Sequence, residues 1–580
     1  MTRTDTFVVG ALVVLLVLVA GLIGAPAIQS SFATASASPA PAATEPPAAA
    51  RAYVEGVLGA PTSVSPLTAQ TQADRDLVAL VFSGLVRNGP GGTVVPDLAA
   101  HWSVDATGTT WTVTLRDDAR WHDGEPVTAD DVVFTIQTLQ DPTYSGPAAG
   151  SWSEVTVRAI DPQTVTFTLD TPLGGFLQAL TQPIAPAHLL ADVPVTMLPD
   201  DPFGRQPVGS GPFALVDLTS TGATLVPALG AAVPEAEGAP SAFATDSLTT
   251  AAPTIRPQRP VPYLAGIEFR FYDDPDDLAD DYRAGRLDGA SGLPPALAAE
   301  LGATAGSRLL RYPGSTLTTA LLNLRPTHPE FADAAVRTAL LAAIDRQAII
   351  DDDYGGSAEI AANAVPPTSA LFDASAVPVV PADPKAAERA LKAAGWSKKT
   401  DGWYLPKAKV PLSIEVLSPT EEANPGAFAA AASVVADWKA IGLGATHLAL
   451  PPGEFVSERL AKGDFAAAVA DVSIGLDPDL YPLLASSQTL SGRSNVIGLQ
   501  DPDLDKLLAA ARTPGTDEAR KAAYTALEQR LASGRYLLPL VFANETLVVR
   551  DALGGPVVRQ VGDPSDRFWD VLTWRLADGR

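Results

Sequence analysis

Strands and helices alternate along this 580-residue chain, and that alternation predicts an α/β fold. Two kinds of pattern carry the prediction. Several short segments alternate apolar and polar residues with period two, which is typical of half-buried strands. Segments with helix-start signals lie between them. The chain is too long for a single hydrophobic core, so we expect two to four domains or subdomains.

The predicted strands cover residues 110–115, 165–169, 267–271 and 412–416. A capping box at residues 128–131 predicts the start of one helix. Asp383-Pro384 and Asp501-Pro502 predict the starts of two more, and Gly395 predicts the end of the first of these. The apolar spacing of Val336, Leu340, Leu341 and Ile344 predicts a fourth helix.

The N-terminus carries an uncharged apolar run from Phe7 to Ile23. With the residues up to Ile28 it is long enough to span a bilayer as a helix. Two interpretations of residues 1–28 stay open, a cleaved signal peptide and an uncleaved transmembrane anchor. Both place the bulk of the chain outside the cytoplasm. Residues 29–50 are rich in Ala, Pro, Ser and Thr, which predicts a disordered linker.

Composition excludes several functional classes. A formal net charge of −26 argues against nucleic-acid binding, because a phosphate backbone requires clustered Lys and Arg. The absence of cysteine excludes disulfides, thiol catalysis, Cys-ligated metals and a lipoprotein anchor. The five histidines are scattered without metal-ligand spacing, so we expect no metal and no cofactor. The acidic run at residues 273–277 is interpreted as a helix start rather than a calcium loop.

Residues 226–260 interrupt the alternation of strands and helices. This stretch contains six prolines and a single aromatic residue, Phe243. We interpret it as a surface insertion or a disordered loop. No phosphate-binding loop and no Gly-x-Ser-x-Gly elbow occurs in the sequence, so we expect a protein that is not an enzyme.

Several motifs then follow one another in the order and spacing of a known family. They are Pro96-Asp97-Leu98-Ala99, Trp121-His122-Asp123-Gly124-Glu125-Pro126-Val127-Thr128-Ala129-Asp130-Asp131-Val132, Pro207-Val208-Gly209-Ser210-Gly211-Pro212-Phe213, Leu322-Asn323-Leu324, Ala393-Ala394-Gly395-Trp396 and Asp477-Pro478-Asp479. The set resembles the extracellular solute-binding proteins of ABC transporters, peptide/nickel-binding family 5, over roughly residues 51–575. The same residues have structural roles, since Gly209 and Gly211 suit a tight backbone passage.

The resemblance implies a two-lobed, periplasmic-binding-protein-like (class II) fold with an extra subdomain on the first lobe. The chain then crosses twice between the lobes. The implied ranges are residues 51–92, 207–318 and 545–580 for the first lobe, 93–206 for the extra subdomain and 319–544 for the second lobe. The resemblance also implies that the lobes close around a ligand in a cavity between them.

Two departures from the family pattern concern the ligand. The family's Asn-Pro-x-Tyr-Trp motif is absent, because its position falls in the insertion. In peptide-binding members an Asp three residues before an acidic-Pro pair holds the ammonium group of the peptide. Here Ile474 stands at that position, so either the nearest upstream acid, Asp471, substitutes or the ligand lacks an amino terminus. The candidate ligand-binding residues are Asp471, Ser473, Asn323 and Asn495.

The leading hypothesis is an exported, monomeric solute-binding component of an ABC importer. It captures a peptide or a similar medium-sized solute and delivers it to the permease subunits. Its location is the periplasm or the outer face of the cell membrane, and it contacts the membrane through the run from Phe7 to Ile23 if that helix is uncleaved. An alternative is a membrane-tethered sensor on the same scaffold, its cavity filled by its own side chains. A third hypothesis, an exported hydrolase, requires a Ser/His/Asp cluster assembled in space.

Overall fold

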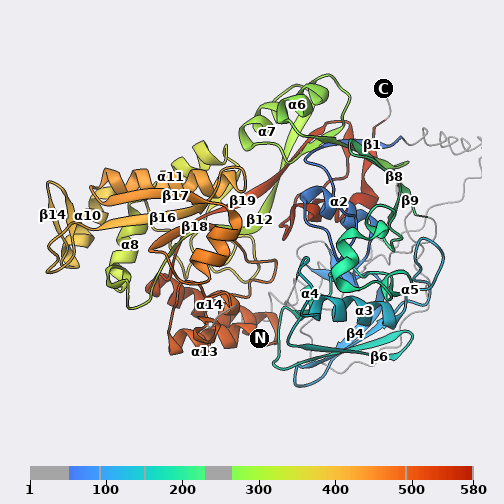
Figure 1. The fold of residues 1–580 in the computed structure, drawn as a ribbon, viewed down its shortest axis with the longest axis horizontal. Helices are drawn as coiled ribbons and strands as arrows, with labels where there is room; N and C mark the ends of the chain where they lie inside the picture. The colour runs from blue at the N-terminus through green and yellow to red at the C-terminus, as the bar shows by residue number, and fades with distance from the viewer. Residues whose placement is uncertain (1–50, 90–92, 149–151, 229–263, 490–492, 578–580) are drawn as a thin grey trace, which may run out of the picture. The chain divides into compact units, whose positions relative to one another are not determined.

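A mixed sheet runs through the described part of the chain (Figure 1). The computed structural model describes residues 51–89, 93–148, 152–228, 264–489 and 493–577. Within these ranges the large sheet has eleven strands. In spatial order they are β17 (Gly444–Leu450), β16 (Ser413–Pro419), β18 (Ala467–Ser473), β12 (Ser307–Leu322), β19 (Leu537–Arg550), β11 (Gly289–Ser291), β1 (Tyr53–Leu58), β10 (Ile267–Tyr272), β9 (Gly222–Pro227) and β8 (Phe213–Leu218), and β13 (Ala358–Ile360) pairs with β19 off this path.

The two longest strands, β12 and β19, connect the two ends of this sheet. They lie side by side and pair antiparallel from Ser307 opposite Arg550 to Leu321 opposite Leu537 (Figure 1). One half of β19 pairs with β11, and the far half of β12 pairs with β18. The register shifts between Pro313 and Leu317 of β12, so an irregularity lies at mid-length in this strand.

A separate four-stranded antiparallel sheet lies in the extra subdomain. Its order is β4 (Ala99–Val104), β5 (Thr110–Leu115), β7 (Thr164–Leu169) and β6 (Val155–Asp161). One face is buried, because Trp111, Val113 and Leu115 alternate with half-buried threonines along β5. Trp111 and Phe167 both pack against Phe176, with ring centroids 5.5 and 5.6 Å apart. This aromatic cluster anchors the sheet to the helices beside it.

Helices alternate with the strands. They are α2 (Gln72–Val81), α3 (Ala129–Gln140), α4 (Phe176–Ala179), α5 (Ala187–Leu190), α6 (Pro275–Arg283), α7 (Pro295–Gly302), α8 (Ala334–Ala342), α9 (Arg346–Ala348), α10 (Pro384–Ala393), α11 (Pro425–Ala440), α12 (Tyr481–Leu484), α13 (Pro502–Arg512) and α14 (Asp517–Gly534). Four of them begin with an Asp or Asn cap followed by proline, at Asp274, Asp383, Asn424 and Asp501. The cap side chain accepts free backbone N–H groups, and proline needs no partner at the first position.

Short elements complete the described chain. Three small antiparallel pairs are β2 (Val86–Asn88) with β3 (Val94–Pro96), β14 (Ser397–Lys399) with β15 (Gly402–Tyr404), and β20 (Leu553–Gly554) with β21 (Arg575–Leu576). Single 3₁₀ or π turns are η2 (Val195–Asp200), η3 (Pro202–Gly204), η4 (Pro329–Phe331), η5 (Ile349–Asp353), η6 (Glu454–Leu460), η7 (Ser486–Thr489), η8 (Pro564–Phe568) and η9 (Val571–Thr573).

The hydrophobic cores follow from strand alternation. On β18, Ala467 and Val469 belong to one core, whereas Ala468 and Ala470 belong to another. Successive strand residues point to opposite faces, so the second-lobe part of the sheet is covered on both sides. Residues of the first lobe and of the extra subdomain share a single core, in which Leu77, Trp111 and Phe213 all take part.

The predicted local elements are confirmed. The four predicted strands correspond to β5, β7, β10 and β16, and the four predicted helices to α3, α8, α10 and α13. The acidic run at 273–277 starts α6, whose cap is Asp274. The tight passage is also confirmed, because a Cβ added to Gly209 would lie 1.9 Å from the Val81 carbonyl oxygen.

Three sequence predictions fall outside the described residues: the N-terminal helix at 1–28, the linker at 29–50, and the insertion at 226–260 beyond residue 228. Among the helices that the structure does describe, none combines the length and the apolar character needed to cross a membrane.

Candidate functional site

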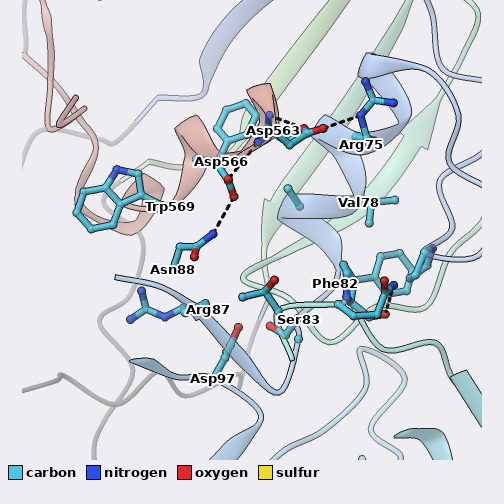
Figure 2. Close-up of a pocket in the computed structure, with 18 of the residues that line it drawn as sticks. Arg75, Val78, Phe82, Ser83, Arg87, Asn88, Asp97, Asp563, Asp566 and Trp569 are labelled. Atoms are coloured by element: carbon cyan, nitrogen blue, oxygen red, sulfur yellow. Dashed lines mark hydrogen bonds and ion pairs between the residues drawn. The ribbon is translucent and has the colours of Figure 1, made fainter. Parts of the chain in front are cut away.

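A cavity of about 570 Å³ lies among elements of the first lobe and the extra subdomain (Figure 2). Its wall is formed by α2, β2 and the segments 179–183 and 559–572, together with residues such as Asp97, Pro147 and Trp152. The volume suits a medium-sized solute. None of its lining residues falls within 319–544, the range predicted for the second lobe, so this cavity is not the predicted cavity between the lobes.

Helix α2 supplies the apolar part of the wall. Leu77, Leu80 and Val81 are fully buried in the core, whereas Val78 and Ala79 line the cavity. This division follows from the helical period, which places residues three and four apart on one face. Aromatic side chains from other elements, among them Trp152 and Trp569, also line the cavity.

The acidic side chains of the wall already have partners. Asp563 lies 3.0 Å from Nε of Arg75 and accepts the Ser565 backbone N–H at 2.9 Å. Asp566 accepts the Gly562 N–H at 2.8 Å and Nδ2 of Asn88 at 3.1 Å. Figure 2 shows the Arg75–Asp563 and Asn88–Asp566 contacts. Burial raises the pKa of Asp566, against the lowering effect of the Arg559 charge.

Two arginines of the wall lack such partners. Arg87 forms no ion pair and donates no hydrogen bond to a described residue, and its Nε is buried. Arg559 donates through Nη1 to the Gly89 carbonyl at 3.2 Å, but its Nε and Nη2 are buried without an acceptor among the described residues. Burial lowers the pKa of both guanidinium groups. Arg559 also stacks on Trp569, with 4.8 Å from its central carbon to the ring centroid.

A buried ion triad joins η8 to α2 and to β1 next to this wall. Arg567 of η8 donates to Asp76 on α2 at 2.7 and 2.6 Å and to Glu55 on β1 at 2.7 Å. Their side chains are 4, 2 and 0 % exposed, respectively. Burial alone would lower the pKa of Arg567, but the two carboxylates raise it well above its ordinary value. The triad therefore fixes the C-terminal segment against α2.

Two of the four sequence candidates, Asn323 and Asn495, are buried and hydrogen-bonded to backbone groups. Asn323 is fully buried and donates to the carbonyls of Gly463 and Phe465 at 3.0 and 2.8 Å. Asn495 donates to Leu484, Ala485 and Leu499 and accepts the Leu499 N–H at 3.2 Å. Their amides are occupied by backbone groups, so we assign both residues to structure rather than to ligand contact.

The other two candidates lie together at the end of β18, in the second lobe. Asp471 and Ser473 are both exposed. The Asp471 carboxylate accepts Oγ1 of Thr318 at 2.6 Å and Nδ2 of Asn424 at 2.8 Å. It forms no ion pair with a described residue, so its negative charge is not neutralised within the described fold.

Glu545 on β19 was not singled out by the sequence. It is half-buried and, among the described residues, receives no hydrogen bond on its side chain. Burial raises its pKa to about 7, and the negative charges of Asp563, Asp76 and Asp471 contribute in the same direction. Of these acids, Asp563 lines the cavity.

The hydrolase hypothesis finds one serine–histidine pair. Ser418 Oγ lies 2.8 Å from Nε2 of His447, but Ser418 is fully buried and donates its proton to the Pro419 carbonyl. No acidic side chain of the described residues hydrogen-bonds to His447. The pair therefore lacks both an accessible nucleophile and the third member of a triad. Across the described ranges, no three His, Asp or Glu side chains cluster as metal ligands.

Comparison with known proteins assigns the chain to a family. The model of the bacterial extracellular solute-binding proteins, family 5 (middle region), matches residues 93–492, which is more than half of the chain. The chain belongs to the bacterial extracellular solute-binding proteins, family 5. Members are binding proteins that act outside the cytoplasm, and their fold is a two-lobed α/β fold.

Individual relatives cover most of this family 5 chain. Protein XP55 of Streptomyces lividans is 29 % identical over 522 residues, which is 87 % of this chain and 86 % of that protein. A dipeptide-binding protein of Pseudomonas aeruginosa is 25 % identical over 510 residues, 84 % of this chain and 88 % of that protein. The structure of the oligopeptide-binding protein AppA of Bacillus subtilis, in complex with a nonapeptide, matches with a TM-score of 0.68 at 22 % identity, over 91 % of this chain and all of that one.

Sequence reasoning missed the two cavity arginines. Arg87 directly follows the apolar pair Leu85-Val86, and Arg559 follows Val557-Val558. That local pattern is too common to indicate a site. Arg559 lies 470 residues from Gly89, its hydrogen-bond partner beside Arg87, so only the folded chain brings the two arginines together.

Proposed function

We propose that this chain captures a peptide or a similar medium-sized solute outside the cytoplasm and delivers it to an ABC permease. The observation that carries the proposal is the first-lobe cavity of about 570 Å³, lined by apolar and charged side chains, in a family of solute-binding proteins. Relatives that bind dipeptides and oligopeptides support peptides as the first ligands to test. Its role is binding rather than catalysis.

Asp471 is the proposed partner of a ligand ammonium group. Its exposed carboxylate is oriented by Thr318 and Asn424 and carries an unneutralised charge. Glu545 adds a second carboxyl group, whose pKa is raised by burial and further by the surrounding negative charge. A cationic group placed near these acids would lower the repulsion between them.

The sensor alternative expects a cavity filled by the chain's own side chains. That expectation concerns the cavity between the lobes, so the observed cavity, whose lining lies outside residues 319–544, does not bear on it. The importer proposal includes attachment to the membrane through residues 1–28 and contact with permease subunits. Family membership supports both points.

The first test is ligand stabilisation of the full-length protein. We expect the tripeptide Ala-Phe-Ala to raise the melting temperature, since a ligand at 100 times its Kd adds about 2.7 kcal/mol to the free energy of unfolding. Ala79 is exposed on α2 and lines the cavity, so Ala79→Trp should fill the cavity and abolish the shift. The matched control is Ala510→Trp, at an exposed alanine of α13, which should keep it.

The Asp471 part of the proposal has its own comparison. Asp471→Asn should weaken binding of Ala-Phe-Ala but leave N-acetyl-Ala-Phe-Ala unaffected, because only the free amino terminus carries a charge.

If libraries of peptides and metal chelates give no shift in melting temperature at any concentration, transport of such cargo is excluded. If the peptide raises the melting temperature of Ala79→Trp as much as that of the unmodified protein, the peptide binds outside this cavity.

A further inference from the structure

Lysine is unevenly distributed along this chain. The sequence has ten lysines, and six of them lie between residues 385 and 409. Residues 383–411 carry seven basic and three acidic side chains, whereas the whole chain has a formal net charge of −26. The segment contains α10, the β14–β15 hairpin and the loop that leads into β16. We call residues 383–411 the basic tip.

Short contacts hold the parts of the basic tip together. Figure 1 shows α10 and β14 next to each other at one end of the ribbon. A Cβ added to Gly395, just past α10, would lie 3.4 Å from Cγ of Pro406. One added to Gly402 of β15 would lie 3.2 Å from Cβ of Pro411. Both ends of the loop 406–411 therefore lie against α10 and the hairpin, so the charges of all three parts gather at the same end of the fold.

The lysines of the basic tip are exposed, and most have no acidic partner. Lys398 pairs with Glu388 at 3.0 Å. Within the described ranges, no ion pair involves the other five, which are Lys385, Lys392, Lys399, Lys407 and Lys409. The remaining acids have other donors, since Asp401 accepts the Tyr404 hydroxyl at 2.6 Å and Asp383 caps α10. The basic tip thus presents positive charge on a chain that is otherwise acidic.

An apolar side chain protrudes among these charges. Val410 is 71 % exposed, the largest exposed fraction of any large apolar side chain in the described residues. It directly follows Lys409, and Lys407 precedes it by three residues. Lys407 has a left-handed backbone, with φ of 68°, a conformation that favours glycine over any side chain. Lysines around a protruding apolar residue are typical of a surface that contacts an anionic membrane.

We propose that the basic tip docks on the anionic phospholipid headgroups of a membrane surface. This contact goes beyond solute capture and does not depend on it. Lysine is a point charge on a flexible stem, which suits headgroups without a fixed arrangement. In the rest of the chain arginine outnumbers lysine 29 to 4. Val410 enters the headgroup layer while the ammonium groups stay beside the phosphates.

The negative charge of the remaining chain restricts the contact to this tip. At physiological ionic strength the screening length is about 8 Å, so acids farther than this from the lipid have little effect on the docked lysines. Acidic faces that approach the same surface are repelled. The basic tip therefore determines which end of the protein faces the lipid.

Energy transfer to labelled lipid tests the contact with the full-length protein. The chain has no cysteine, so Thr400→Cys gives a single labelling site at the exposed turn of the β14–β15 hairpin. With an acceptor dye on the headgroups, transfer should be at least about twofold stronger when phosphatidylcholine vesicles contain phosphatidylglycerol. Raising the salt from about 0.1 M to about 1 M shortens the screening length from about 10 Å to about 3 Å and should remove most of this difference. A label at Ala510→Cys, exposed on α13, should show a smaller difference.

Two charge-matched variants locate the contact. The tip variant carries Lys392→Gln, Lys407→Gln and Lys409→Gln. The control variant carries Lys462→Gln, Lys506→Gln and Lys521→Gln. Titration with the anionic vesicles should show affinity at least about tenfold weaker for the tip variant and unchanged for the control. Val410→Ser should weaken the affinity several-fold and keep its salt dependence, because it removes only the apolar contact.

Three results would overturn the proposal: equal transfer to neutral and anionic vesicles, transfer that is insensitive to salt, or equal losses in the tip and control variants. If the tip variant lowers solute uptake by cells while transfer does not distinguish the vesicles, the basic tip serves an acidic protein partner instead. Should the tip variant melt at a lower temperature, Val410→Ser and the salt dependence decide. The peptide-induced shift in melting temperature is measured without lipid, so solute capture stands or fails separately.

Discussion

Arg567 shows how a single residue maintains the cavity wall. Its guanidinium lies between Glu55 and Asp76, and all three side chains are almost fully buried. Replacing it with methionine would leave two buried carboxylates without a counter-charge. We expect Arg567→Met to lower the free energy of unfolding by about 3 to 5 kcal/mol, measured by urea denaturation at pH 7.

An exposed pair provides the control. Arg283 contacts Glu300 and Asp280 with side chains that are 41, 63 and 74 % exposed. Arg283→Gln should lower the free energy of unfolding far less than Arg567→Met does, because water competes for exposed ion pairs. Equal losses in the two variants would show that the triad does not hold the C-terminal segment against α2.

At the scale of elements, a pair of glycines connects the extra subdomain with the second lobe. The Gly174 backbone N–H donates to the Arg512 carbonyl at 2.6 Å. A Cβ added to Gly175 would lie 2.9 Å from Cγ of Asp477, whose carboxylate is held by Arg520 at 2.9 and 2.8 Å. A larger residue would crowd this contact, because the backbone of Gly175 packs directly against the side chain of Asp477.

Gly175→Ala should weaken that contact and, with it, the conformation in which the two parts touch. If ligand binding favours this conformation, the Kd for the tripeptide should rise several-fold, and calorimetric titration measures the change. Gly453→Ala is the matched control, because an added Cβ there meets no atom within 4 Å. The same Kd in both variants would show that the glycine contact plays no part in binding.

Local elements were predictable because their signals are local. The Asp-Pro starts of α10 and α13 and the alternation in β5 each involve adjacent residues. The pairing of β12 with β19 was not predicted, since the two strands lie far apart in sequence. The site was least predictable. Asn323 matched a motif but serves the backbone, whereas Arg87 and Arg559, far apart in sequence, line one cavity only in the folded chain.

At the scale of the whole molecule, buried acids set the response to pH. Burial raises the pKa of Glu545 and of Glu528 to about 7, above the ordinary value of 4.5, and that of Asp570 to about 6. Between the ordinary and the raised values the folded state binds more protons than the unfolded state. The free energy of unfolding should therefore fall as the pH rises from about 5 to about 8.

Glu545→Gln tests this response at one position. The variant cannot ionise, so its free energy of unfolding should fall less between pH 5 and pH 8, by on the order of 1 to 2 kcal/mol. Urea denaturation across that pH range measures the difference. Glu300→Gln, at an exposed position, should follow the unmodified protein. Parallel curves for Glu545→Gln and the unmodified protein would contradict the raised pKa.

The central claim is that the first-lobe cavity holds the solute. The most direct measurement is a crystal structure of the full-length protein with a bound solute, either the one that co-purifies with it or a stabilising peptide. We predict electron density for the ligand inside the cavity, beside Trp569. A ligand bound elsewhere, with this cavity holding only water, would contradict the claim.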